Sequence, residues 1–508
     1  MSMKNKFLHL IFSRLVITGI LILIQVLFLI GFLLRISDYF IYAQALFFIF
    51  SILMVIYIIN RNSNPTFKLP WVILIILFPI FGGILYWMFG KNHIQKRVQK
   101  FYRETKKLTK EDPEIRKKLK QENSLAASQS HYLYQYAHAP LYGHTETKYY
   151  PIGEVFYEDL LDALRSAKKF IFLEYFIIDF GVMWSSILDV LKEKVKEGIE
   201  VRVMYDDIGC VALLPKRYYK ELESLGIKCV PFNRFIPIVS VIHNNRDHRK
   251  IAIIDGNIGF TGGINLADEY INQKEKYGHW KDTALRLRGE GVWNLTVLFL
   301  ESWNKFRKTD TNCDKYRPTL FFKNADVGYV QPYGDTPLDE ELVGQNVYLN
   351  LIEQAKSYIY INTPYLILDY EMLSALALAA KRGVDVRIVT PHIPDKWYIH
   401  IISQSYYETL IRSGIKIYEY QPGFLHAKSF LVDDELGTVG SINLDYRSLI
   451  HHYECGVWMY RTEALKAMKQ DYLETLEKCI FVDRHFCSQI PWYKRWCKDF
   501  LQLFAPLL

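Results

Sequence analysis

One pattern of polar residues occurs twice in this 508-residue chain, and the repeat limits the possible folds more than any other feature. In each copy a histidine, a lysine and an aspartate are followed, after six residues, by a glycine, a small residue, an isoleucine and an asparagine. The first copy consists of His248, Lys250, Asp255, Gly262, Gly263 and Asn265, and the second of His426, Lys428, Asp433, Gly440, Ser441 and Asn443. Because the spacing is identical, chance is a negligible explanation, and the chain contains two copies of one structural unit.

The sequence before each copy shows the same order of helix and strand signals. This alternation favours an α/β fold with buried strands. Gly198 and Gly383 occupy equivalent positions, where a glycine commonly ends a helix. The predicted elements, in the order helix, strand, helix and strand, are 157–167, 170–175, 184–197 and 199–205 in the first unit, and 342–355, 358–363, 371–382 and 384–390 in the second.

The spacing within each copy suits a site for a phosphate group. Residues two apart on a strand point to the same face, so the histidine and lysine of one copy can address one anion. The glycines let the returning backbone come close to the site, and Asn265 and Asn443 offer amide N–H donors. Imidazole titrates near neutral pH, so His248 and His426 can act as nucleophile or proton carrier.

The first ninety residues differ in composition from the rest of the chain. Three apolar segments approach the roughly 20 residues that a helix needs to cross a bilayer, namely 15–34, 41–59 and 71–89. Buried core helices and a cleavable signal peptide are the alternatives, but the near absence of charge and of a cleavage site argues against both. We expect residues 1–90 to form N-terminal transmembrane helices. Two or three segments span the membrane, because Pro79, Gly82 and Gly83 favour a kinked or re-entrant third one.

Positive charge is concentrated directly after the third apolar segment. The whole chain has 62 Lys and Arg against 54 Asp and Glu, and residues 90–110 contain eight of these basic residues with Glu104 as their one acid. This basic collar favours a cytoplasmic location for the following domains, although Lys4, Lys6 and Arg14 draw the N-terminus to the same side. We expect a multi-pass protein of the cell membrane with a basic juxtamembrane linker at 91–130. The nearly neutral remainder argues against a nucleic-acid partner.

The two copies resemble the paired HKD motifs of the phospholipase D superfamily. That resemblance implies two α/β/α sandwich domains related by a pseudo-two-fold axis, which we place at 131–330, with its HKD motif at 243–270, and at 331–508, with its motif at 421–448. RDHRKIAIIDGNIGFTGGINLADEY, HWKDTALRLRGEGVW and SINLDYRSLIHHYECGVWMY are similar to the bacterial cardiolipin synthases, as is KLPWVILIILFPIFGGILYWMFGKN. Two departures from the family pattern put headgroup preference in doubt: Ala284, where a histidine is frequent, and His451-His452, where Leu-Asn is frequent.

The resemblance implies that two phosphatidylglycerol molecules become cardiolipin and glycerol by double displacement. By family analogy His248 is the nucleophile and His426 the proton carrier, with exchanged roles left open. Lys250 and Lys428 would neutralise the phosphate together with Asn265, Asn443, Gly262, Gly263, Gly440 and Ser441. No cofactor and no metal are expected, since no His/Asp/Glu cluster has metal-site spacing. The expected partners are phosphatidylglycerol, cardiolipin and the lipid bilayer; the oligomeric state is not predicted.

Several residues keep two interpretations at this point. Asp255 and Asp433 either support the site electrostatically or bond backbone amides at the strand–turn junction. Asp282 and Glu454 either orient the histidines or are ordinary strand-edge acids. Residues 233–246 form either a membrane-dipping loop or a buried cross-strand.

Three other functions compete with phosphatidyl transfer. A phospholipase D that transfers the phosphatidyl group to water is the nearest alternative, whereas a nuclease and a non-catalytic scaffold fit less well. The seven cysteines form no CxxC pair, which argues for reduced thiols.

Overall fold

The computed structural model describes residues 41–61, 65–78, 108–234, 245–307, 312–319, 327–339 and 341–488, with a few isolated positions elsewhere. Three of the regions singled out in the sequence lie wholly or largely outside these ranges: the apolar segment 15–34, the basic collar and the loop within 233–246. The apolar segment 71–89 is described from residue 71 to residue 78 and at a few isolated positions after that.

The first sheet has seven strands in the order β1-β7-β6-β5-β2-β3-β4. The strands β2, β3 and β4 are parallel, and the other neighbours pair antiparallel. Their bounds are β1 Thr145–Tyr150, β2 Phe170–Tyr175, β3 Glu200–Asp206, β4 Lys228–Phe232, β5 Lys250–Ile254, β6 Ile258–Gly262 and β7 Ala284–Gly289. The helices of this part are α9 Gly153–Arg165, α10 Val182–Lys196, α11 Tyr218–Ser224 and α12 Val292–Phe306.

The second sheet repeats this arrangement and adds one strand, in the order β15-β11-β10-β9-β12-β13-β14-β8. Its bounds are β8 Tyr329–Asp335, β9 Tyr358–Asn362, β10 Asp385–Pro391, β11 Lys416–Tyr420, β12 Ser429–Val432, β13 Leu436–Gly440, β14 Glu454–Tyr460 and β15 Cys479–Val482. The accompanying helices are α13 Val343–Gln354, α14 Tyr370–Lys381, α15 Trp397–Arg412, α16 Glu463–Leu476 and α17 Arg484–Ser488. All eight helices and strands predicted from the repeat are confirmed, as is the α/β class with two mixed sheets.

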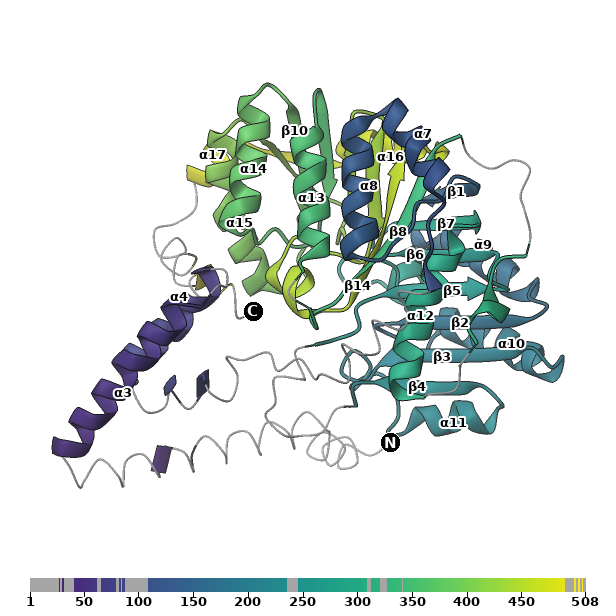
Figure 1. Ribbon diagram of the computed structural model, residues 1–508, viewed down its shortest axis with the longest axis horizontal. Helices are drawn as coiled ribbons and strands as arrows, with labels where there is room; N and C mark the ends of the chain where they lie inside the picture. Colours follow the sequence, from purple (N-terminus) through teal and green to yellow (C-terminus); the bar gives the residue numbers. More distant parts are fainter. Residues whose placement is uncertain are drawn as a thin grey trace.

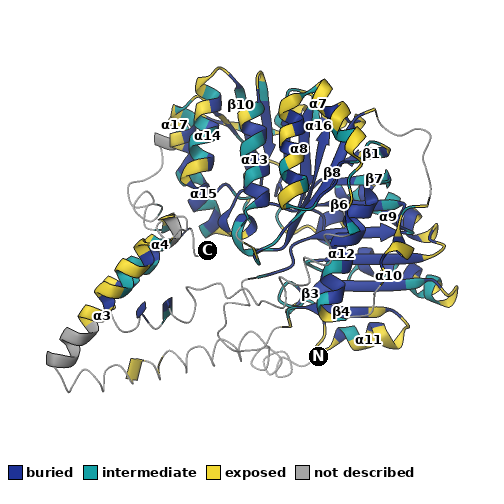
Figure 2. Cartoon of the chain, in the orientation of Figure 1, coloured by how far each residue is buried: buried dark blue, intermediate teal, exposed yellow. Residues whose placement is uncertain are grey.

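The strand sequences explain why both sheets are covered on both faces. All six residues of β2 are buried, as are all five of β5, and apart from Glu174 and Lys250 these strands are nearly continuous apolar runs rather than alternating ones. Figure 1 shows the first sheet at the lower right and the second above it, and Figure 2 shows the strands of both almost entirely buried. Each sheet has its own apolar core, and a third core joins the two domains through α12 and α16. The domains therefore form one continuous packed body.

Short backbone bridges fix the two histidine motifs at this domain interface. The His248 amide donates to the Tyr453 carbonyl at 2.9 Å, and the His426 amide donates to the Lys281 carbonyl at 2.7 Å. The first bridge joins the segment before β5 to the segment before β14, and the second joins the segment before β12 to the segment before β7. The pairing is reciprocal, as the duplication leads one to expect.

The N-terminal part of the described chain is helical. The helix α3 (Ile41–Ile59) has the bounds of the second predicted apolar segment, and α4 spans Pro65–Leu77. Among the residues that the structure describes, no helix combines the length and the apolar character that crossing a membrane requires. That two or three of the apolar segments span the membrane stays a prediction.

Part of the predicted linker 91–130 is folded onto the second domain. The helices α7 (Pro113–Glu122) and α8 (Ser124–Tyr136) occupy it, and Asp112 and Asn123 cap their N-termini. Gln129 donates from Nε2 to the Val347 carbonyl of α13 at 3.0 Å. The predicted domain boundaries stay predictions, but α8 packs with the second domain.

Candidate active site

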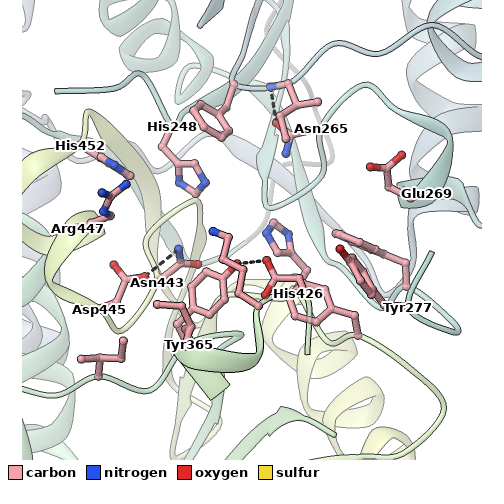
Figure 3. A pocket seen from close by; sticks show the side chains of 18 of the residues that line it. His248, Asn265, Glu269, Tyr277, Tyr365, His426, Asn443, Asp445, Arg447 and His452 are labelled. Atoms are coloured by element: carbon pink, nitrogen blue, oxygen red, sulfur yellow. Dashed lines mark hydrogen bonds between the residues drawn. The ribbon is translucent and has the colours of Figure 1, made fainter. Parts of the chain in front are cut away.

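A cavity of about 430 Å³ lies where the two domains meet, and both motif histidines line its wall. Asn265 and Asn443 also line it, and Figure 3 shows the two imidazoles approaching each other across it. Both histidines are 7% exposed, so each ring reaches solvent only through the cavity. The duplicated motifs thus build one site rather than two.

Each histidine is held by an acid of the other domain. His248 Nδ1 lies 2.8 and 3.0 Å from the two carboxylate oxygens of Glu454, the first residue of β14. His426 Nδ1 lies 2.6 Å from Oδ2 of Asp282, two residues before β7. An ionised carboxylate accepts the Nδ1 proton and leaves the Nε2 lone pair toward the cavity, which is the form that a nucleophile or base needs. A protonated carboxyl instead donates to Nδ1 and leaves the ring proton on Nε2, which is the form that an acid needs. The sequence named both acids as candidate partners, and the structure shows that the pairing crosses between domains.

The two histidine–carboxylate pairs differ in charge. Burial lowers the pKa of His248 to about 3, and it places the pKa of His426 well below its usual range. Burial works against ionisation of Glu454, but the attraction and hydrogen bond of His248 outweigh it, so the pKa of Glu454 is lowered. Burial raises the pKa of Asp282 to about 7. At neutral pH Glu454 is therefore an anion, whereas Asp282 holds a proton about half of the time.

The two lysines lie beneath the site. Lys250 begins β5 and Lys428 precedes β12, and each is two residues from its histidine on the same strand face. Lys250 Nζ donates to the His248 carbonyl at 2.5 Å, and Lys428 Nζ donates to the His426 carbonyl. Burial lowers the pKa of Lys250 to about 8 and that of Lys428 to about 7. Both ammonium groups act on Glu454 and Asp282, so positive charge is concentrated between the histidines.

The two asparagines are not equivalent. Asn265 donates from Nδ2 to the Tyr270 hydroxyl at 2.6 Å and accepts the Ile177 amide at 3.0 Å. Asn443 makes only a long 3.5 Å contact to Asp445, and its buried Oδ1 has no hydrogen-bond partner among the described residues. The amide of Asn443 is thus the more available of the two for a ligand.

The four small residues of the motifs pack closely against the segments that carry the two acids. A Cβ on Gly263 would lie 2.1 Å from Oδ1 of Asp282, and one on Gly440 would lie 2.3 Å from the Cys455 carbonyl. Gly262 likewise faces the Thr283 carbonyl at 2.4 Å, and Ser441 donates to Glu454. Glycine at 262, 263 and 440 thus permits these close approaches, and Ser441 holds Glu454 in place. That these four residues bind phosphate stays a prediction.

Asp255 and Asp433 do not reach the cavity. Asp255 accepts the backbone amides of Lys168, Lys169 and Phe170 at 2.7–2.9 Å. Asp433 accepts those of Lys356, Ser357 and Tyr358 at 2.6–2.8 Å. Both aspartates follow a motif strand at the end opposite to the histidine, and both have a left-handed φ. The assignment of these two aspartates as catalytic residues is therefore replaced by the alternative one, in which they bind backbone amides at the strand–turn junction.

Replacing Asp433 with asparagine tests this role. Asparagine tolerates the left-handed φ of 52° but loses the charge that accepts three amides. We expect a loss of about 1–2 kcal/mol in stability, or roughly 2–4 °C in Tm, with kcat within about threefold of the wild type. Thermal unfolding and turnover of purified protein measure both, with Glu435→Gln as the surface control. A hundredfold fall in kcat at an unchanged Tm would restore the catalytic assignment.

The structure adds residues that the motifs did not reveal. His452, Arg447 and Asp445 line the cavity beside His248, and Trp280 and Tyr270 line it beside His426. The sequence had marked His452 only as a departure from the family pattern. The other departure, Ala284, is 1% exposed at the start of β7 and belongs to the core.

One group of residues could hold a metal ion. Within the described ranges, ligand atoms of His248, His452 and Glu454 lie within 4.8 Å of one another. The sequence does not reveal this group, because its members come from two domains and are far apart along the chain. The Nδ1 proton of His248 already bonds Glu454, and Lys250 acts on the same carboxylate, so a cation would have to displace a proton against a neighbouring positive charge.

Two further predictions concern surrounding residues. The five cysteines whose side chains the structure describes form no disulfide: Cys210, Cys229, Cys313, Cys455 and Cys479. Residues 235–244 lie outside the described residues, so both interpretations of the 233–246 loop stay open.

Comparison with known proteins connects this site to a family. A family model described as "Cardiolipin synthase, PLD-like domain" matches residues 160–280 and 348–476, and one described as "Phospholipase D-nuclease N-terminal" matches residues 49–91. The chain is 44% identical over 460 residues to an uncharacterized protein of Streptococcus mutans, covering 89% of this chain and 99% of the relative.

Two named relatives are similar over nearly their whole length. The identity is 35% over 471 residues with cardiolipin synthase 2 of Bacillus anthracis, covering 90% of each chain. It is 34% over 469 residues with cardiolipin synthase of Alkalihalophilus pseudofirmus, covering 89% of this chain and 91% of the relative. Among solved structures, phosphatidylserine synthase of Haemophilus influenzae has a TM-score of 0.57 at 17% identity and covers 76% of this chain and 100% of its own, a likeness of fold.

Proposed function

We propose that this chain, which belongs to the cardiolipin synthase family of the phospholipase D superfamily, joins two phosphatidylglycerol molecules into cardiolipin and releases glycerol. The chain is a phosphatidyltransferase that acts on phospholipids. One observation carries the proposed mechanism: two buried imidazoles, each fixed by a carboxylate of the other domain, face one cavity. Such a pair can supply a nucleophile on one side of a phosphate and a proton carrier on the other.

The first half-reaction forms a phosphatidyl-histidine. The Nε2 lone pair of His248 attacks phosphorus, the new P–N bond forms, and the P–O bond to the glycerol headgroup breaks. Glu454 stabilises the positive charge that develops on the ring. The departing oxygen takes the Nε2 proton of His426 while the proton held by Asp282 passes to Nδ1, so glycerol leaves neutral.

The second half-reaction reverses these movements with a different alcohol. The primary hydroxyl of another phosphatidylglycerol gives its proton to His426 Nε2, and the proton on Nδ1 returns to Asp282. The hydroxyl oxygen attacks phosphorus, the P–N bond breaks, and His248 is regenerated. Lys250 and Lys428 offset the charge on the non-bridging oxygens in both transition states through the field of their buried ammonium groups.

The difference between the two acids supports the assignment of roles. Glu454 is an anion at neutral pH and favours a ring that becomes cationic, as a phosphorylated His248 does. The pKa of Asp282, raised to about 7, suits a carboxyl that holds and returns a proton. His248 is therefore the nucleophile, and His426 with Asp282 is the proton carrier.

Product analysis tests the proposed function. Purified protein with labelled phosphatidylglycerol is expected to give cardiolipin and free glycerol in equal amounts, separated by thin-layer chromatography. Phosphatidic acid without cardiolipin would instead identify a hydrolase that uses water as the acceptor, and no product in either form would reject both. Adding phosphatidylethanolamine shows whether that lipid also serves as a donor.

The site is proposed to work on a cytoplasmic membrane surface, held there by the predicted apolar segments of residues 1–90. Three exposed side chains support this orientation: Val182, Tyr370 and Trp397, which are 53%, 79% and 67% exposed. Each is the first residue of the helix that follows a parallel strand, so all three lie at the strand ends nearest the cavity. We call these three residues the rim. Exposed aromatic residues beside a lipid site favour contact with the headgroup region.

Trp397→Ala tests the rim. Removal of the indole is expected to lower activity on phosphatidylglycerol vesicles roughly fivefold to thirtyfold, because the surface contact of one large side chain contributes about 1–2 kcal/mol. Activity in detergent micelles should stay within about twofold. Leu378→Ala is the matched control, since Leu378 is 61% exposed but lies near the other end of α14. An equal loss of activity on vesicles for both variants would contradict the proposed contact of the rim with the membrane.

A further inference from the structure

The cavity has a polar half beside His248 and an aromatic half beside His426. Register makes the comparison direct: Gly262 pairs with Ala284 in the first sheet and Gly440 with Gly456 in the second, so Trp280 and His452 occupy equivalent positions. In the same way, Glu269 and Arg447 lie four residues after the equivalent asparagines. The duplicated site is thus chemically different at two positions that line the cavity.

The aromatic half carries one ion pair and one further cation, Lys396, whose charge acts on His426 and whose Nζ lies 5.6 Å from the Tyr365 ring centre. The Trp280 ring lies 5.5 Å from that of His426, and Tyr270 lies at the same distance. Glu269 is bonded to Lys276 at 3.1 Å. This half offers mainly aromatic surface, with the Glu269–Lys276 pair and Lys396 beside it.

On the polar half the groups are available. Neither ring nitrogen of His452 has a hydrogen-bond partner in the described part of the chain, and its Nδ1 lies 3.7 Å from the nearest Glu454 oxygen. Arg447 is exposed, and within the described ranges its guanidinium forms no hydrogen bond or ion pair. The neighbouring acid, Asp445, accepts the Ser448 amide at 2.7 Å and contacts Asn443 at 3.5 Å. Figure 3 shows Arg447 and His452 together on the side of His248.

We infer that Arg447 and His452 form a subsite for a second phosphate, the non-reacting phosphodiester of the acceptor lipid. The inference rests on the proposed function, in which both substrates carry a phosphate. Guanidinium and imidazole N–H groups are the usual donors to such an anion. The aromatic half presents the single ammonium of Lys396 instead of this pair, so the pair favours one orientation of the acceptor.

The distances fit the product. The ring centres of His248 and His452 are 5.5 Å apart. In cardiolipin a three-carbon bridge with its two oxygens separates the phosphorus atoms, a span of roughly 5–7 Å for single bonds of about 1.5 Å. The two rings are therefore no farther apart than the two phosphates of the product, so one cardiolipin headgroup can contact both.

Two acceptors that differ only in the phosphate provide the test. Transfer to phosphatidylglycerol requires the subsite, whereas exchange of labelled free glycerol into phosphatidylglycerol uses the same histidines and no second phosphate. Arg447→Gln and His452→Phe are expected to lower cardiolipin formation roughly 10- to 100-fold and glycerol exchange less than about threefold. Phenylalanine keeps a ring beside His248, and Arg447→Lys, which keeps the charge, should restore part of the lost rate.

The control is Lys396→Gln, which removes another cation from the cavity wall and should leave the ratio of the two rates unchanged. Equal losses with both acceptors, or no loss in either variant, would overturn the subsite. If the wild type exchanges glycerol but forms no cardiolipin, the proposed function fails instead.

Inhibition by inorganic phosphate identifies the source of the anion. Stronger inhibition of the wild type than of Arg447→Gln means that the subsite also accepts the free anion. If phosphate does not inhibit, and the variants still lose cardiolipin formation but not glycerol exchange, the subsite binds only the phosphate of the lipid.

Discussion

His248→Ala abolishes phosphatidyl transfer and also prevents any covalent intermediate, because its Nε2 is the atom that attacks phosphorus. The rate is expected to fall at least roughly ten-thousandfold, as is usual when a catalytic nucleophile is removed. His426→Ala should stop turnover of phosphatidylglycerol to a similar extent. It should still form phosphatidyl-His248 from a p-nitrophenyl phosphatidyl ester, whose leaving group needs no proton. Acid-quenched labelling of the protein together with product analysis distinguishes the two variants.

The matched control is His279→Ala, which removes another first-domain histidine, one that contacts the Tyr420 hydroxyl at 3.1 Å. It should retain turnover within about threefold. Label on His248→Ala protein but not on His426→Ala protein would show that the two histidines have exchanged roles. Label on neither protein, with normal folding, would rule out a covalent path.

The sequence was sufficient to predict the repeated order of helices and strands, because buried strands and amphipathic helices have distinct patterns over windows of this length. It was not sufficient to show that His248 pairs with Glu454 and His426 with Asp282. The spacing of residues along the chain does not show how the two domains pack against each other. That pairing depends on the third apolar core, which joins α12 and α16 across the interface.

The misassigned residues have simpler explanations. A strand rises about 3.3 Å per residue, so the five residues from Lys250 to Asp255 span roughly 16 Å, and the aspartate belongs at the other end of β5. The motif glycines permit close approach, and the groups that approach them are the Asp282 carboxylate and the backbone carbonyls of Thr283 and Cys455. His452 was overlooked as a cavity residue because the interval between the motif and β14 differs from that between the motif and β7.

Glu454→Gln and Asp282→Asn separate the functions of the two acids. The amide of Glu454→Gln cannot accept the Nδ1 proton of His248 as a carboxylate does, so the wrong tautomer of His248 becomes populated. The amide of Asp282→Asn can donate to Nδ1 of His426 but cannot transfer a proton to it. Glu454→Gln is expected to lower the rate roughly a thousandfold to ten-thousandfold with phosphatidylglycerol and with the p-nitrophenyl ester, because attack itself is impaired. Asp282→Asn should lower it roughly a hundredfold to a thousandfold with phosphatidylglycerol and less than tenfold with the ester. Equal losses for both variants with both substrates would contradict the division of roles.

The pH dependence of kcat/KM for the donor lipid provides an independent check on Asp282. His248 is neutral above its pKa of about 3, so it imposes no limit between pH 5 and pH 9. The Asp282 proton is lost as the pH rises through its pKa of about 7, and the charge of Lys428 is lost over the same range. The charge of Lys250 is lost at slightly higher pH, through its pKa of about 8. With phosphatidylglycerol all three losses matter, whereas with the p-nitrophenyl ester only the two lysine charges matter, so above pH 7 log kcat/KM should fall with a slope about one unit steeper for phosphatidylglycerol than for the ester. Lys428→Arg, whose charge persists to high pH, should make both slopes shallower by about one unit and keep the difference between the substrates. The same slope for both substrates in the wild type would show that Asp282 does not supply the proton for the departing glycerol.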